Sequence, residues 1–146
     1  MEKILTLDSL NKTAKEIIKK VKSGKEKGAT ILALYGDLGA GKTTTTKEIA
    51  RVLGVKERVI SPTFVIMKIY KTIDKKFKNL IHIDAYRLCK KEELFRLGWN
   101  EIIKDKNNLI ILEWPERVLE CLPSNIYKIK LDHKDESTRT IKFCLE

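Results

Sequence analysis

Apolar residues recur along the chain in short runs that predict a sheet. Continuous apolar runs over residues 29–35, 80–84 and 109–112 are typical of strands that are buried on both faces. Residues 3–7 alternate between apolar and polar and predict a short edge strand. Residues 65–71 alternate in part and predict a hairpin with the run at 80–84, with a tip rich in lysine.

Between these strands, apolar residues at helical spacing predict helices. The first predicted helix carries an apolar stripe from Leu10 to Val21 and has Asp8 or Ser9 as its N-cap. Two more are predicted at residues 44–53 and 92–97, which end before Gly54 and Gly98. The last is predicted at residues 115–119, with Pro115 in its first turn. A closing hairpin is predicted for residues 126–131 and 138–145. Strands that alternate with helices indicate an α/β fold.

We therefore predict a three-layer fold, in which a mostly parallel central sheet is flanked by helices and extended by antiparallel hairpins. The 146 residues are expected to form a single domain, residues 1–146, long enough to bury about two-thirds of the unfolded surface. The composition, 42% hydrophobic and 34% charged, excludes a disordered or membrane-embedded chain. Without a spanning segment or a signal peptide, and with three widely spaced cysteines, the chain is expected in the reducing cytoplasm.

Residues 36–43 match the phosphate-binding loop G-x-x-x-x-G-K-[ST]. The loop lies between a predicted strand and a predicted helix, so that glycine backbone N–H groups and the helix N-terminus can surround phosphate oxygens. We expect Lys42 to reach the β- and γ-phosphates of a nucleoside triphosphate and the Thr43 hydroxyl to ligate Mg²⁺. The predicted nucleotide-binding residues are Gly36, Asp37, Leu38, Gly39, Ala40, Gly41, Lys42, Thr43 and Thr44. The fold is therefore predicted to be P-loop NTPase-like.

Two acidic residues end apolar strands, where an open α/β sheet places its ligand. Glu113 has the form of the second nucleotide-binding motif, whose acid holds Mg²⁺ directly or through water, and Asp84 competes for that role. Thr63 follows Pro62 in a constrained loop near the expected γ-phosphate or metal, although a Ser-Pro-Thr sequence is more often only a turn. His82 is expected to be a packed strand residue that lies off the face of Asp84.

The formal net charge of +10 has two interpretations. One is a basic surface that meets tRNA or another nucleic acid. The other is a set of lysines spread over solvated faces. We favour the second, because the lysines are scattered along the sequence and no basic stripe is interleaved with aromatic residues.

Four segments in this order resemble the TsaE (YjeE) family: GDLGAGKT, SPTF, HIDAYRL and ILEWPER. Residues 93–101 also resemble the Leu-Gly-x-x-Glu segment of that family, so the resemblance covers essentially the whole chain. The family is the small ATPase of bacterial tRNA threonylcarbamoyladenosine (t⁶A) biosynthesis. The resemblance implies ATP and Mg²⁺ as cofactors and a P-loop ATPase activity.

By the same resemblance, Lys42, Asp84, Glu113 and Thr63 are the catalytic residues. Glu113 joins Thr43 at Mg²⁺, Asp84 has a catalytic or switch role, and Thr63 is a switch-like threonine.

Three further roles come from the resemblance alone. Trp114 is implied to make a structural or signalling contact beside the site. Thr13 and Arg139 are implied to lie near the base and the phosphates, respectively. One departure is the run of four threonines at residues 43–46, which puts the packing of the following helix in doubt but leaves nucleotide binding unaffected.

The resemblance also implies partner proteins of the TsaD and TsaB type. ATP hydrolysis would reset their complex between turnovers, and the lone chain would hydrolyse ATP slowly. Direct contact with tRNA stays open, and neither DNA nor a membrane is expected as a partner.

Two other functions stay open on the sequence. A small-molecule or nucleoside kinase would use the same loop, but the arginines are scattered and no lid-like insertion is visible. A nucleotide-dependent interaction switch would need no meaningful hydrolysis. Guanine specificity is disfavoured, because no Asn-Lys-x-Asp motif occurs and residues 11–14 lack the acid.

Overall fold

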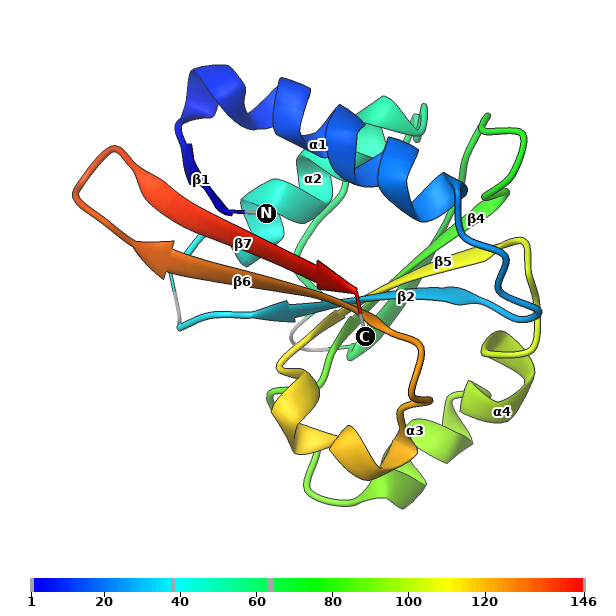
Figure 1. Ribbon diagram of the computed structural model, residues 1–146. Helices are drawn as coiled ribbons and strands as arrows, with labels where there is room; N and C mark the ends of the chain where they lie inside the picture. The colour runs from blue at the N-terminus through cyan, green and yellow to red at the C-terminus, as the bar shows by residue number, and fades with distance from the viewer. Residues whose placement is uncertain (1, 38, 63–64, 146) are drawn as a thin grey trace.

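A mixed seven-stranded sheet runs through the computed structural model, which describes residues 2–37, 39–62 and 65–145 (Figure 1). The strands are β1 (Glu2–Leu5), β2 (Thr30–Tyr35), β3 (Met67–Lys71), β4 (Asn79–Asp84), β5 (Asn108–Glu113), β6 (Tyr127–His133) and β7 (Arg139–Leu145). Their order across the sheet is β1-β7-β6-β2-β5-β4-β3. Strands β6, β2, β5 and β4 pair in parallel, whereas β1–β7, β7–β6 and β4–β3 are antiparallel pairs. The predicted parallel centre with antiparallel hairpins is confirmed.

Helices cover both faces of this sheet. They are α1 (Leu7–Lys22), α2 (Lys42–Val52), α3 (Lys91–Arg96), α4 (Trp99–Ile102) and the short 3₁₀ helices η1 (Pro115–Arg117) and η2 (Leu119–Cys121). Figure 1 shows α1 and α2 on one face and α3 and α4 on the other. None of the described helices is both long and apolar enough to cross a membrane.

Alternation along the central strands divides the core between these two faces. In β2, Leu32 and Leu34 pack in the cluster beneath α1 and α2, whereas Ile31 and Ala33 pack in the cluster that includes Trp99 of α4. A central strand with helices on both faces needs apolar side chains at every position. This is why the central strands appear in the sequence as continuous apolar runs.

The first helix begins earlier than predicted. Its N-cap is Thr6, in extended geometry, and the Thr6 hydroxyl accepts a hydrogen bond from the Ser9 N–H. The Ser9 hydroxyl in turn accepts from the Thr6 N–H, which completes a capping box. The assignment of Asp8 or Ser9 as the cap was therefore wrong: β1 ends at Leu5, and the helix follows at once.

The four threonines at the start of α2 do not disturb the helix. Thr45 and Thr46 are buried, and their hydroxyls donate to the carbonyl oxygens of Gly41 and Lys42, at 2.7 and 3.0 Å. These bonds to the preceding turn satisfy the buried hydroxyls.

The segment after β5 also differs from the prediction. A single helix over residues 115–119 was expected, but the chain forms two 3₁₀ turns separated by Val118, whose φ of −137° is not helical. Proline does begin the first of these turns, as predicted.

Titration of Tyr127 in β6 tests whether its side chain is buried against Glu26. Its buried hydroxyl donates to Glu26 Oε1 at 2.7 Å, and burial together with the Glu26 carboxylate raises the pKa of Tyr127 to about 12. We expect phenolate absorbance to show a tyrosine that ionises near pH 12, and Tyr127→Phe to remove that step. Because the folded pKa is raised, this contribution to stability is complete below about pH 10 and is lost as pH rises through 12. Unchanged titration in Tyr127→Phe would contradict the assignment.

Candidate functional site

The site begins where parallel strands end side by side. Asp84 of β4 lies opposite Glu113 of β5, which in turn lies opposite Leu34 of β2. The two carboxylates extend the sheet face that packs beneath α2, because alternate residues of each strand share a face. Both side chains are nearly buried, with Asp84 5% and Glu113 3% exposed. Two acids are thus held at one edge by strand register alone.

The phosphate-binding loop connects β2 to α2 at this same edge. Gly39 and Gly41 have φ values of +80° and +100°, a left-handed backbone that glycine adopts without strain. Gly41 is the N-cap of α2 and supplies no side-chain cap. The N–H groups of the first helical turn therefore stay available for an anion.

Lys42, the first residue of α2, is only 5% exposed. Its ammonium donates to the Gly36 carbonyl oxygen and lies 3.8 Å from the centroid of the Trp114 ring. Burial lowers the pKa of Lys42, although the nearby carboxylates, Glu113 first, act in the opposite direction. The cation is thus desolvated, and its direct contacts are with two neutral groups that an incoming anion could replace.

Trp114 owes its position over Lys42 to an unusual backbone. Its φ of 58° and ψ of 51° are left-handed, which is uncommon for a bulky residue and turns the chain sharply after β5. The Trp114 ring lies 4.9 Å from that of Tyr86, which the Arg117 guanidinium faces at 5.6 Å. These contacts form a small stack beside the loop.

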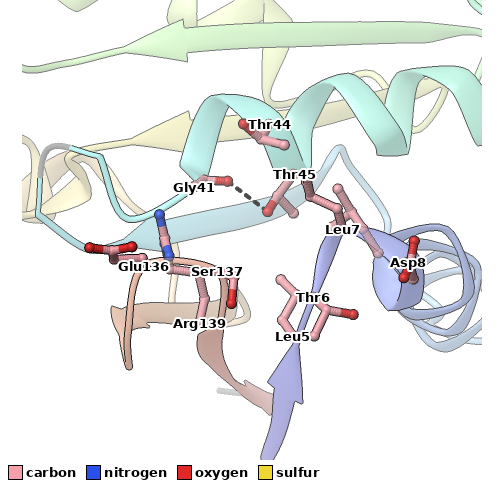
Figure 2. A pocket seen from close by; sticks show the side chains of 11 residues that line it. Leu5, Thr6, Leu7, Asp8, Gly41, Thr44, Thr45, Glu136, Ser137 and Arg139 are labelled. Atoms are coloured by element: carbon pink, nitrogen blue, oxygen red, sulfur yellow. Dashed lines mark hydrogen bonds between the residues drawn. The ribbon is translucent and has the colours of Figure 1, made fainter.

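Two neighbouring cavities open around the start of α2. The smaller, about 250 Å³, is lined by Gly39, Gly41, Lys42, Thr43, Thr44, Ser61, Asp84, Glu113, Trp114 and Arg139. The larger, about 610 Å³, is lined by Leu5, Thr6, Leu7, Asp8, Leu10, Gly41, Thr44, Thr45, Glu136, Ser137 and Arg139. Figure 2 shows the larger cavity between the start of α1, the first turn of α2 and the turn that joins β6 to β7. Since the cavities share Gly41, Thr44 and Arg139 in their walls, they adjoin each other at the start of α2.

His82 is a packed strand residue, as predicted, but the face predicted for it was wrong. Residues two apart in a strand share a face, so His82 lies on the same face as Asp84. It is fully buried, and its Nε2 is hydrogen-bonded to Glu113 Oε2 across the β4–β5 pair. His82 therefore supports an acid of the site directly.

Comparison with known proteins finds a family that has the sequence pattern of this chain over nearly its whole length. The sequence model of the family described as "Threonylcarbamoyl adenosine biosynthesis protein TsaE" matches residues 5–141. The chain belongs to the TsaE family. Membership gives it a role in t⁶A biosynthesis and a P-loop fold that binds a nucleotide.

Individual TsaE relatives agree. The tRNA threonylcarbamoyladenosine biosynthesis protein TsaE of Rickettsia prowazekii is 40% identical over 110 residues, 75% of this chain and 73% of the relative. That of Bacillus subtilis is 34% identical over 135 residues, 92% of this chain and 82% of the relative. The crystal structure of B. subtilis YdiB superposes with a TM-score of 0.67 at 30% identity, covering 98% of this chain and 86% of that one.

The structure gathers most of the predicted site residues of this TsaE chain. Lys42, Thr43, Thr44, Asp84, Glu113 and Arg139 line the smaller cavity. Thr13 is buried in α1 and is not among the residues that line either cavity, so its contact with a base stays a prediction. Leu38 and Thr63 lie outside the described residues.

Sequence reasoning missed several residues of the site. The alternation of β4 contained the signal for His82, because residues two apart in a strand share a face and His82 lies two residues before Asp84. No local signal identified Leu5, Leu7, Glu136 and Ser137, because only the pairing of β1 with β7 brings the two ends of the chain together at the larger cavity.

The hydrogen bond between His82 and Glu113 can be measured by a double-mutant cycle. His82→Ala and Glu113→Ala should each lower the free energy of unfolding, and we expect a coupling of about 1–3 kcal/mol, since either substitution strands a nearly buried polar partner. Chemical denaturation of the four proteins gives the coupling. Strictly additive effects would show that the contact contributes nothing.

Proposed function

We propose that the chain is a Mg²⁺-dependent ATPase of the t⁶A machinery that supports turnover of a TsaD–TsaB transferase complex in the cytoplasm. The observation that carries the proposal is the placement of a desolvated Lys42 and two strand-end carboxylates on one cavity at the start of α2. Phosphoryl transfer requires little more of a protein than this, since positioning and electrostatic stabilisation supply most of the catalysis.

The phosphate groups would be bound by the backbone N–H groups of the loop and the first turn of α2. Lys42 would exchange the Gly36 carbonyl and the Trp114 ring, both neutral, for phosphate oxygens. Its burial favours this exchange, because a desolvated ammonium gains more from an anion than an exposed one does.

The donor set fits Mg²⁺. The Thr43 hydroxyl and the Glu113 carboxylate are hard oxygen ligands on one cavity, and Mg²⁺ bound with phosphates needs only one or two such groups. Mg²⁺ would neutralise charge that develops on the phosphate oxygens. His82 would hold the Glu113 carboxylate in position, and Asp84, on the same cavity, would orient the attacking water or a water on the metal. Thr63 retains the switch role that the resemblance implies.

The nucleoside would occupy the larger cavity, which adjoins the phosphate cavity. Its apolar lining from Leu5, Leu7 and Leu10 suits a base. Arg139 points from β7 toward the first turn of α2 (Figure 2). Its guanidinium donates to the Gly39 carbonyl oxygen at 3.4 Å. This position suits contact with the phosphates.

The lysine of the loop gives the decisive test. Lys42→Ala should abolish multi-turnover t⁶A formation in a system reconstituted with TsaD- and TsaB-type proteins, because the phosphates lose their buried cation. Lys47→Ala is the matched control, since Lys47 lies on the same helix, is exposed and does not line the two site cavities. Wild-type turnover by Lys42→Ala would refute the mechanism.

Glu113→Gln tests the metal ligand and the reaction class. The amide preserves size and leaves Lys42 in place, so ATP binding should persist while hydrolysis falls by at least about tenfold and the Mg²⁺ requirement rises. Labelled phosphate from wild-type protein should appear in water as inorganic phosphate. Its transfer to a nucleoside or another acceptor would favour a kinase instead.

A further inference from the structure

The net positive charge is concentrated in two segments. Residues 12–28 hold seven lysines and two glutamates, and residues 71–78 hold four lysines and one aspartate. These segments therefore account for eight of the ten units of net charge. The lysines are scattered along the chain, but the excess charge they produce is not.

On α1 the lysines form a stripe. Lys12, Lys15, Lys19 and Lys22 are all exposed, and at 100° per residue they lie within an arc of about 80° on the helix surface. This arc faces away from the buried side of the helix, which carries Ala14, Ile17 and Val21 among others. Over about 15 Å of helix, this arc carries lysines alone after the first turn, and Glu16 at its border is ion-paired with Lys3.

The β3–β4 turn extends this stripe. Lys76 Nζ donates to the carbonyl oxygens of Lys22 and Gly24 at 2.8 and 2.9 Å, and Lys22 forms an ion pair with Asp74. Figure 1 shows the turn beside the C-terminal end of α1. Lys75 and Lys78 of the turn are exposed. We call Lys12, Lys15, Lys19, Lys22, Lys75 and Lys78 the basic ridge.

Helix stability does not explain this arrangement. Lysines in the last turn interact favourably with the helix dipole, and Lys12 attracts the carboxylate of Glu16 four residues on, but Lys15 has neither contribution. Lys15 and Lys19 are i,i+4 neighbours of like charge, which destabilises a helix by about 0.2–0.5 kcal/mol. Within the described part of the chain, Lys22 is the member of the ridge that forms an ion pair.

We propose that the basic ridge binds the phosphate backbone of RNA directly. Lysine ammonium groups act on phosphates as point charges, and a ridge without aromatic residues favours backbone contact that is independent of sequence. RNA is favoured over an acidic protein because the relatives' names give tRNA as the molecule that the pathway modifies. None of the six lysines lines the two site cavities, so RNA and nucleotide would bind separately.

Anisotropy of labelled, unmodified tRNA measures this binding with the full chain. The K15E/K19E variant should bind tRNA at least about tenfold more weakly than wild type. When the logarithm of the binding constant is plotted against the logarithm of the salt concentration, the slope for the variant should be smaller in magnitude by about 1–2. K15R/K19R, which keeps the charge, should bind like wild type. K90E/K91E changes the net charge equally at the start of α3, on the other face of the sheet, and should lose little.

Three outcomes would overturn the proposal. These are wild-type affinity in K15E/K19E, an equal loss in K90E/K91E, and polyglutamate that binds the wild-type protein as tightly as tRNA does at equal charge concentration. The last result would indicate an acidic protein as the partner. ATP binding by the same preparations checks folding, and K15Q/K19Q replaces K15E/K19E in the comparison if the reversal disturbs the fold.

Discussion

Parallel pairing of β5 with both β2 and β4 is the constraint on which the site depends. It brings the carboxyl ends of three strands to one edge of the sheet, opposite the start of α2. Register then sets Glu113 beside Asp84, and alternation turns both toward the helix that begins with Lys42. The apolar strands and the geometry of the candidate site therefore depend on each other, because a slip of one residue in β5 would turn Glu113 to the opposite face.

The same edge of the sheet holds one lysine and two carboxylates, each of which would destabilise the fold if it were buried without a partner. Lys42, Asp84 and Glu113 are each at most 5% exposed, and a buried charge without a partner is strongly destabilising. Several contacts reduce this cost. Lys42 has a carbonyl, an aromatic face and the attraction of both carboxylates, Glu113 has His82, and Asp84 accepts from the Tyr86 N–H. A site satisfied in this way is complete enough to fold and still gains from a charged ligand.

The sequence was sufficient for most of the fold and for the centre of the site. Continuous apolar runs, glycine stops and a phosphate-loop motif are local signals, and they located β2, β4, β5 and α2 to within a few residues. The N-cap at Thr6 was missed because it depends on where β1 stops pairing, and the 3₁₀ turns after Pro115 were missed because Trp114 and Val118 adopt backbone angles that composition does not reveal. The basic ridge was missed for a similar reason, since it unites segments some 50 residues apart.

The pairing of β1 with β7 has a consequence for the order in which the protein is made. Among the described strands, β1 pairs only with β7, so β1 is synthesised well before residues 139–142, with which it pairs. The larger cavity also needs both segments, because its walls include Leu5 and Leu7 near β1 and Glu136, Ser137 and Arg139 near the start of β7. A nascent chain that stops before β7 therefore carries the phosphate loop without the complete cavity, so the larger cavity cannot form before β7 is synthesised.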